Sequence, residues 1–213
     1  MTPSAATRAL TCLIVLPALA APAGVEILLK KIEARYNRTQ SLKLDFSETY
    51  AGTKSPVQSE TGVLYLRKPG RMRWEYTSPA GKLFLSDGKE VVTYSPADHS
   101  AEKGKLKESE DVHAPIAFLL GKLDFQKEFK SFETRSEGGD TWIVATPKSE
   151  NLAWSRVDFL ATPDGQIRRV RIALQDQSKL DFTFSNEQLN APVAPAMFTF
   201  QPPPGVKVVE AGP

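Results

Sequence analysis

The sequence predicts a mainly β protein in which consecutive strands form a curled antiparallel sheet or half-open barrel, accompanied by helices. Short runs of alternating apolar and polar side chains follow one another along most of the chain, separated by tight turns. Short turns join antiparallel neighbours, so a meander of about eight to eleven strands is expected. The stretch from Gly62 to Tyr76 also carries apolar side chains on both faces of its first half, as expected for a sheet covered on both sides.

The elements follow from periodicity in chain order. Val25–Tyr36 carries an apolar stripe at helical spacing and is predicted to be an amphipathic helix. Glycine, proline and Asp-Gly pairs then separate the strands. The predicted strands and hairpins cover Leu42–Tyr50, Gly62–Tyr76 with a turn at Pro69-Gly70, Leu83–Tyr94 with a turn at Asp87-Gly88, Trp142–Thr146, Trp154–Leu160, Ile167–Leu174, Leu180–Phe184 and Phe198–Phe200.

The second half of the Gly62–Tyr76 stretch alternates cleanly. Met72, Trp74 and Tyr76 fall on one face, while the residues between them are charged. A row of large apolar side chains on one face suits either a plain core or a surface that holds an apolar ligand. Both interpretations remain open from the sequence.

Two segments interrupt the strand pattern. Ala101–Asp111 is polar with mixed charges and is expected to be a loop. Pro115 then opens a short apolar helix, Ile116–Leu120, which Gly121 ends. This helix could be a core plug or a lid over a cavity, and the polar loop before it would allow a lid to move.

The N-terminus resembles a secretory signal. Arg8 precedes an apolar run, and Ala18-Leu19-Ala20 provides an A-x-A cleavage pattern, although Ala21 and Ala23 also fit. A retained anchor is the alternative, but the run is shorter than the about 20 residues that a spanning helix needs. The expected organisation is therefore a signal over residues 1–20 and a single exported domain over residues 21–213.

Composition excludes several functions. Cys12, inside the expected signal, is the single cysteine, so the exported chain would have no disulfide and no acylated cysteine. Without Arg8 the chain holds 26 of its 27 Lys and Arg residues against 25 Asp and Glu, a balance that does not favour nucleic-acid binding. The basic run at Arg168, Arg169 and Arg171 is expected to be a solvated strand face.

Motifs for catalysis or metal binding are missing from the sequence. His99 and His113 have no second histidine or cysteine at ligand spacing, so no metal is expected. No nucleophile elbow, phosphate-binding loop or dinucleotide-binding motif occurs. The chain is therefore expected not to be an enzyme and to need no cofactor.

The order of several short motifs resembles the LolA family, the periplasmic carriers of outer-membrane lipoproteins. The motifs are Gly62–Pro69, Trp74, Pro79, Leu85–Lys89, Tyr94, Pro96, Pro115–Leu120 and Phe198–Pro203. The resemblance implies an incomplete antiparallel β-barrel, a half-barrel with a helical lid, in which acyl chains lie in a cavity. It also implies a monomer that takes acylated lipoproteins from an inner-membrane ATP-driven transporter and passes them to an outer-membrane receptor lipoprotein.

The resemblance also suggests which residues form the site. The candidates for the lipid cavity and its lid are Leu64, Leu66, Met72, Trp74, Tyr76, Leu83, Leu85, Tyr94, Ile116, Phe118, Leu119 and Leu120. Lys68 and Arg67 are the candidates for a latch that holds the lid. The family usually has arginine at the position of Lys68, and lysine offers a point charge in place of a planar fork.

Two other functions stay open for the same fold. The cavity could carry another envelope lipid, such as a glycolipid or an isoprenoid. Alternatively, the chain could be an interaction module that senses lipoproteins.

Overall fold

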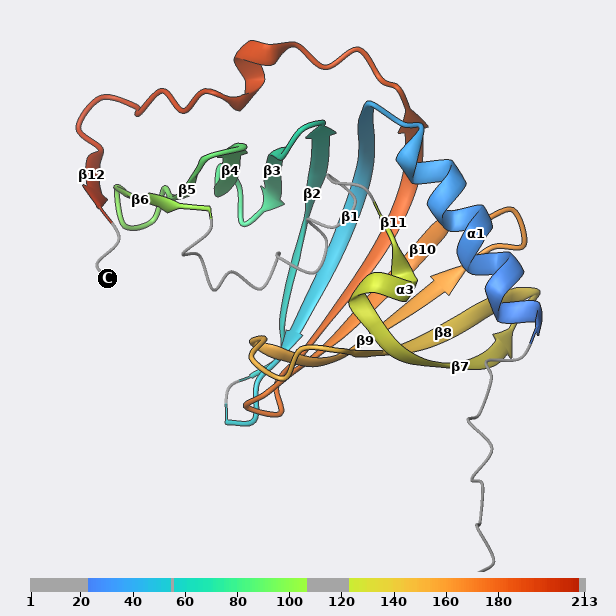
Figure 1. The fold of residues 1–213 in the computed structure, drawn as a ribbon. Helices are drawn as coiled ribbons and strands as arrows, with labels where there is room; N and C mark the ends of the chain where they lie inside the picture. The colour runs from blue at the N-terminus through green and yellow to red at the C-terminus, as the bar shows by residue number, and fades with distance from the viewer. Residues whose placement is uncertain (1–22, 55, 107–122, 211–213) are drawn as a thin grey trace, which may run out of the picture.

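The computed structural model describes residues 23–54, 56–106 and 123–210. Their strands form a single 12-stranded sheet in the order β12-β6-β5-β4-β3-β2-β1-β11-β10-β9-β8-β7 (Figure 1). The strands are β1 (Ser41–Ala51), β2 (Gln58–Arg67), β3 (Arg71–Ser78), β4 (Leu83–Asp87), β5 (Glu90–Ser95), β6 (Ser100–Lys105), β7 (Phe129–Glu137), β8 (Asp140–Pro147), β9 (Trp154–Ala161), β10 (Ile167–Leu174), β11 (Lys179–Leu189) and β12 (Lys207–Glu210). The helices are α1 (Ala23–Asn37), the single turn α3 (Phe125–Glu128) and the 3-10 turn η2 (Pro195–Phe198).

The sheet is an open, curled meander, as the sequence predicts. Neighbouring strands pair antiparallel throughout, except that β12 lies parallel to β6. The two edge strands, β12 and β7, do not pair with each other, so within the described residues the barrel is not closed. The half-barrel expectation is therefore confirmed, with one more strand than the upper end of the predicted number.

Two expectations about local structure are wrong, and one strand was not expected. Residues 101–105, the first part of the expected loop Ala101–Asp111, instead belong to β6. Their side chains are polar because only Ala101 is buried, and the strand is held by backbone pairing with β5 and β12. Phe129–Glu137, not assigned from the sequence, forms β7. Phe198–Phe200, expected to be a strand, is not one: Phe198 ends the η2 turn, which Pro195 begins, and the two residues after it are irregular.

The inner face of the sheet forms the main core together with α1. Leu29 and Ile32 of α1 are 1% and 0% exposed and join the same apolar cluster as the inward-facing strand residues. Figure 1 shows α1 and α3 on the concave side of the sheet. The amphipathic helix predicted from the sequence is thus confirmed, and its apolar stripe is what covers the concave face.

Helix α1 is fixed to the sheet by a buried polar network. Arg35 Nη2 lies 2.6 Å from Glu187 Oε1, and the Tyr36 hydroxyl donates to Glu187 Oε2 over 2.7 Å. The Ile167 N–H donates to the same hydroxyl over 2.9 Å. Burial, followed by the negative charge of Glu187, raises the pKa of Tyr36 well above its usual range, so this hydroxyl keeps its proton.

A close backbone approach sets the position of α1 further. Gly165, in the β9–β10 turn, has φ +87°, and a Cβ there would lie 2.9 Å from the Ile32 nitrogen. Lys31 Nζ donates to the Pro163 carbonyl of the same turn over 2.8 Å. The turn can therefore sit directly under the helix because residue 165 has no side chain.

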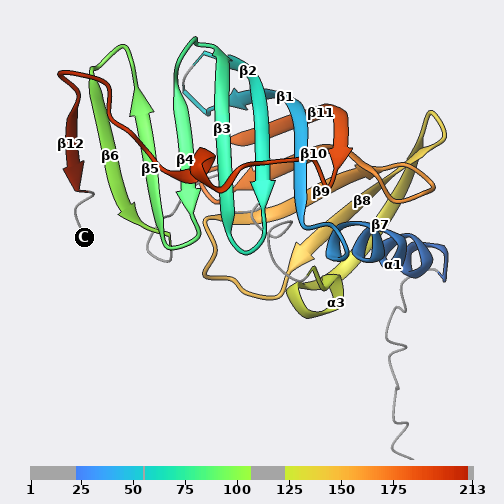
Figure 2. The same ribbon diagram turned by 90° about the horizontal axis from the view of Figure 1, so that it is seen from above.

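The outer face of β2–β5 is covered by the segment 190–206, called the strap here, which connects β11 to β12. Figure 2 shows it crossing over β2, β3 and β4. Arg73 Nη1 donates to the Met197 carbonyl over 2.8 Å, and the Tyr94 and Phe200 ring centroids lie 5.9 Å apart. Phe198 of the strap is 2% exposed. The strap thus gives this half of the sheet a second, smaller apolar layer.

Within the described part of the chain, no helix has the length and apolar character to cross a membrane.

Candidate functional site

The concave face carries a tight group of aromatic rings at its centre. Phe46 of β1 meets Trp74 edge-on at 4.8 Å between centroids, and meets Tyr76 edge-on at 5.1 Å. Trp74 lies 5.6 Å from Phe182 of β11. Strands β1, β3 and β11 therefore supply one continuous cluster of buried aromatic rings. The edge-to-face pairs made by Phe46 are the favoured arrangement for rings.

Gly62 makes room for this group. It lies directly across from Phe46 in the β1–β2 ladder. A Cβ at Gly62 would be 2.7 Å from the Phe46 ring and 2.1 Å from the Glu75 carbonyl. The first residue of the Gly62–Tyr76 stretch is thus a glycine because the Phe46 ring folds over its backbone.

A second aromatic group lies toward β7 and α3. Phe125, at the start of α3, lies 5.5 Å from Phe159 and 6.2 Å from Phe132 between centroids. Phe129 lies 6.0 Å from Trp154. The sequence reasoning missed this group because the spacing of Phe125, Phe129 and Phe132 spans a helix, a strand start and a β-bulge, and so matches neither period.

Charged side chains mark one end of the concave face. Glu48 and Glu60 lie opposite each other across β1 and β2. Lys82 Nζ binds both carboxylate oxygens of Glu60, at 2.8 and 2.6 Å, and lies 4.4 Å over the Tyr76 ring. The apolar surface is therefore bounded here by an ion pair.

Five of the predicted cavity residues come together on this face. The ladder places Leu64 opposite Trp74 and Leu66 opposite Met72, and Tyr76 follows on the same side. All five are less than 5% exposed. Their common placement on one face follows from strand alternation, as expected from the sequence.

Three other predicted cavity residues lie on the opposite face, which corrects their grouping. In the ladder Phe84 lies opposite Trp74, so Phe84 shares the concave face. Leu83 and Leu85 pair with Glu75 and Arg73 and point outward, and Tyr94 is opposite Leu83. Leu83 and Tyr94 line an outer hollow of about 620 Å³ beneath the strap. Strand β4 is buried on both faces, so its sequence alone did not reveal which side faces the concave surface.

The remaining candidates, Ile116, Phe118, Leu119 and Leu120, lie outside the described residues. No three His, Cys, Asp or Glu side chains in the described ranges are grouped so as to hold a metal ion.

Comparison with known proteins places the chain in a family. The family model described as "Outer membrane lipoprotein carrier protein LolA" matches residues 37–201. The chain belongs to the LolA family. The match covers β1 through η2 and therefore includes every strand of the sheet except β12.

Relatives in the LolA family match nearly the full chain. An outer-membrane lipoprotein carrier protein of Chromobacterium violaceum is 28% identical over 200 residues, which cover 94% of this chain and 95% of the relative. One from Bordetella avium is 29% identical over 204 residues, which cover 95% of each chain.

A solved structure shares the fold at low sequence identity. An uncharacterized conserved protein from Thermus thermophilus superposes with a TM-score of 0.55 at 11% identity, covering 88% of this chain and 99% of that one. A LolA superfamily protein from Nitrosomonas europaea reaches a TM-score of 0.46 at 10% identity, with 82% and 97% covered.

The two latch candidates of this LolA-family chain point to different elements. Lys68 Nζ donates to the carbonyls of Tyr36 and Asn37, over 2.7 and 3.2 Å, at the C-terminal end of α1. Burial lowers the pKa of the Lys68 ammonium. Arg67 donates to the Val193 carbonyl of the strap. Lys68 therefore caps a helix end, where a positive charge is favourable, and Arg67 holds the strap on the outer side.

Helix α1 also clamps the chain where it returns at residue 123. The Asn37 side chain donates to the Leu123 carbonyl over 2.8 Å and accepts from the Leu123 N–H over 2.7 Å. The Phe125 N–H donates to Glu33 Oε1 over 2.9 Å, and Glu33 is 8% exposed. Sequence reasoning missed this clamp. The available signal was that Glu33 and Asn37 lie four residues apart on the flank of the apolar stripe.

Proposed function

We propose that this chain is a periplasmic carrier that binds the acyl chains of lipoproteins against the concave face of its sheet and moves them from the inner to the outer membrane. One observation carries the proposal. A chain of the LolA family holds a continuous layer of buried aromatic and aliphatic side chains on the inner side of an open sheet. Such a layer suits flexible alkyl chains, which need exclusion of water and few directional contacts.

The energetics support a passive carrier that depends on a donor. Each buried methylene is worth about 0.8 kcal/mol, so several acyl chains together would cost tens of kcal/mol to remove from a bilayer. Non-covalent binding reaches at most about 18–21 kcal/mol. The carrier therefore accepts cargo that another protein has extracted, and shields it until it can be released.

The partners follow from the same reasoning and from the family. The donor is an inner-membrane ATP-driven transporter, the acceptor is an outer-membrane receptor lipoprotein, and the cargo is an acylated lipoprotein. The carrier acts as a monomer in the periplasm, which it reaches through the signal over residues 1–20. It has no catalytic role, since transfer requires only that the acyl chains move from one apolar surface to another.

Depletion tests the function. Loss of the chain should leave outer-membrane lipoproteins in the inner-membrane fraction, and expression of the wild-type chain should restore their sorting. Normal distribution of lipoproteins after depletion would contradict the proposal.

The identity of the bound material tests the cargo. Mass spectrometry of the chain purified gently from the periplasm should find lipopeptides acylated at an N-terminal cysteine. A glycolipid or isoprenoid in their place would establish a carrier of another lipid. Lipoprotein binding without any effect of depletion on sorting would favour a sensing module.

A further inference from the structure

A hollow of about 620 Å³ lies on the outer face of the sheet, between the strap and strands β3–β5. The sheet supplies Leu83 and Tyr94 to its wall, and the strap supplies Met197, Thr199 and Phe200. Its volume lies within the range of about 300–1,000 Å³ that is usual for ligand pockets. Figure 2 shows the strap crossing over this part of the sheet. The hollow is therefore a candidate binding site on the face opposite to the one proposed to hold acyl chains.

The wall of the hollow combines aromatic rings with hydrogen-bonding groups. The Tyr94 and Phe200 ring centroids lie 5.9 Å apart. The side chains of Thr199 and Gln201 are exposed and form no hydrogen bond with another residue of the described ranges. An alkyl chain has no group that could bind them, whereas a peptide offers N–H and C=O groups along with its side chains. The wall thus fits a peptide better than another alkyl chain.

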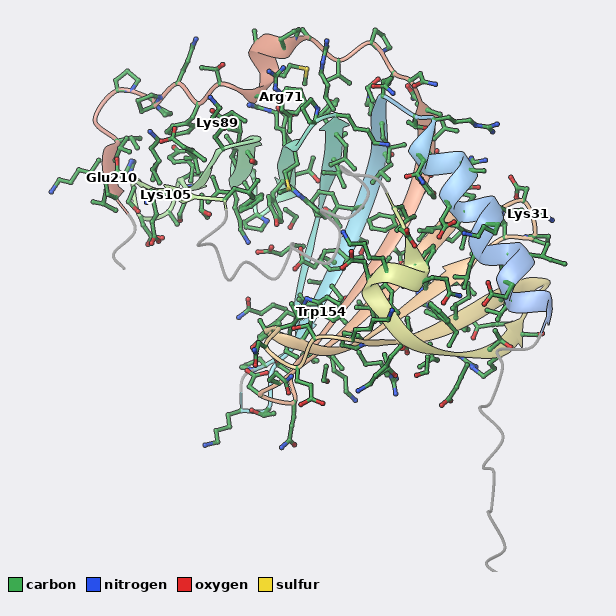
Figure 3. All side chains as sticks on the ribbon, viewed as in Figure 1. Lys31, Arg71, Lys89, Lys105, Trp154 and Glu210 are labelled. Atoms are coloured by element: carbon green, nitrogen blue, oxygen red, sulfur yellow. The ribbon has the colours of Figure 1, made fainter. Side chains whose placement is uncertain are left out.

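The hollow reaches the concave face at the β3–β4 turn. Lys82 lines the hollow, and its Nζ binds both carboxylate oxygens of Glu60, at 2.8 and 2.6 Å. The same Nζ lies 4.4 Å over the ring of Tyr76, which belongs to the concave face. Figure 3 labels Arg71 at the first end of β3, and the β3–β4 turn lies at the other end of this strand. One side chain at the end of the sheet therefore belongs to both surfaces.

This end is also where charge enters the concave face. In β1 and β2 the inward-facing residues are apolar or glycine over Leu42–Phe46 and Gly62–Leu66. The next inward-facing residues are Glu48 and Glu60, which lie opposite each other in the ladder, and Lys82 offsets one of these two charges. The ester carbonyls and the amide N–H of an acylated cysteine would find a donor in Lys82 and acceptors in the carboxylates. The concave face thus has its polar end beside the hollow.

We propose that the hollow beneath the strap holds the first residues of the cargo polypeptide, in extended form, after the acylated cysteine. The acyl chains and the polypeptide of a lipoprotein are covalently joined, so the polypeptide begins where the polar end of the bound lipid lies. With that end at Lys82 and Glu60, the polypeptide reaches the hollow by crossing the β3–β4 turn. This inference rests on the proposed function, because it requires acyl chains on the concave face.

The distance suits a short peptide segment. An extended chain advances about 3.3 Å per residue, and one sheet layer is about 10 Å thick, so about three residues cross the end of the sheet. The fourth residue of the cargo would then lie between the strap and Tyr94. Main-chain groups of the cargo would bind Thr199 and Gln201, which lets one site accept cargo polypeptides of different sequence.

Photo-crosslinking tests this path on the wild-type chain. One triacylated lipopeptide carries benzophenone at its fourth residue, and a second carries it at the end of an acyl chain. Mass spectrometry should map the crosslink of the peptide probe to Tyr94 or to strap residues 197–203. The crosslink of the acyl probe should map to concave-face residues such as Trp74 and Phe182.

Filling the hollow tests the same inference by affinity. Thr199→Trp places a large ring in the hollow, and Thr183→Trp is the matched control at an exposed position of β11. Thr199→Trp should bind the lipopeptide about tenfold more weakly than wild type, because the peptide contacts are lost. Its affinity for the triacylated cysteine methyl ester, which has no peptide, should stay at the wild-type value. Thr183→Trp should bind both probes as the wild type does.

Three results would overturn the inference. The first is a crosslink of the peptide probe to α1 or to the β2–β3 turn at Lys68, which would put the polypeptide at the other end of the concave face. The second is equal weakening of both probes by Thr199→Trp. The third is full lipopeptide binding by Thr199→Trp with loss of loading by the transporter, which would assign the hollow to a partner protein. A wild type whose acyl probe does not crosslink to the concave face would instead contradict the proposed function.

Discussion

The Lys68 ammonium donates to the Tyr36 carbonyl over 2.7 Å and joins the β2–β3 turn to the last turn of α1. The hydroxyl of the same Tyr36 binds Glu187 of β11. The C-terminal end of α1 is therefore held from two sides, by strands that lie on opposite sides of β1 in the sheet. The position of the helix over the concave face depends on both contacts.

Lys68→Leu should lower the free energy of unfolding by about 1 kcal/mol, because two partly exposed charge-assisted hydrogen bonds at the helix end are lost. Lys68→Arg should restore most of it, since arginine can reach the same carbonyls. Urea unfolding of the wild type and of the two variants measures the difference in unfolding free energy. Equal stability of Lys68→Leu and wild type would show that the cap contributes nothing.

Gly165→Ala should destabilise the protein by about 3 kcal/mol, because the new Cβ would meet the α1 backbone and the residue would keep a positive φ. Gly138→Ala is the matched control. Gly138 also has a positive φ, of +59°, but a Cβ there meets nothing within 4 Å. Its cost should be about 1 kcal/mol, from backbone conformation alone. Similar melting temperatures for the two variants would mean that α1 can move away from the turn.

Asp87 should make stability depend on pH at the acid end. Burial raises the pKa of Asp87, but the N–H groups of Glu90 and Lys89, which donate to Oδ1 over 2.9 and 2.8 Å, lower it further, and the net pKa lies below the usual 3.8. The folded state therefore binds this proton less readily than the unfolded state. The resulting stability is fully present above pH 3.8 and is lost as the pH falls through the folded pKa.

Asp87→Asn isolates this effect, because asparagine keeps an acceptor oxygen and removes the charge. The difference in unfolding free energy between wild type and Asp87→Asn should be positive at neutral pH and shrink toward zero in strong acid. A difference that does not change with pH would show that the charge of Asp87 does not stabilise the folded state.

Brominated acyl chains bound on the concave face should quench the fluorescence of Trp74 but not that of Trp142. Trp74 lies on the concave face, whereas Trp142 is 1% exposed on the outer face with the Arg171 guanidinium 4.2 Å from its ring. The chain has 3 tryptophans, so two Trp→Phe changes leave either one alone. Brominated lipopeptide should quench the fluorescence of the variant that keeps only Trp74, and should leave the fluorescence of the variant that keeps only Trp142 nearly unchanged. Quenching of Trp142 alone would place the lipid on the outer face.

The sequence predicted the elements well wherever the pattern was local. The helical stripe of α1, the turns at Pro69-Gly70 and Asp87-Gly88, and the alternation of Met72, Trp74 and Tyr76 all appear in the structure. Each depends on residues close together in the chain, whose spacing directly sets which side chains share a face.

The errors came from contacts between distant segments. Strand β6 looks like a loop because its side chains are polar, and its pairing with β12 depends on residues a hundred positions later. The side of β4 that faces the concave surface depends on its register with β3, since both of its faces are buried.

The sequence by itself thus determined a mainly β chain with a large apolar strand face and an amphipathic helix. Tertiary structure alone decided that Phe46, Trp74 and Phe182 form one surface and that Leu83 and Leu85 lie on the other side. The physical reason is that alternation within a strand fixes only which residues share a face. Which of the two faces meets the helix is fixed by hydrogen-bond register with neighbouring strands.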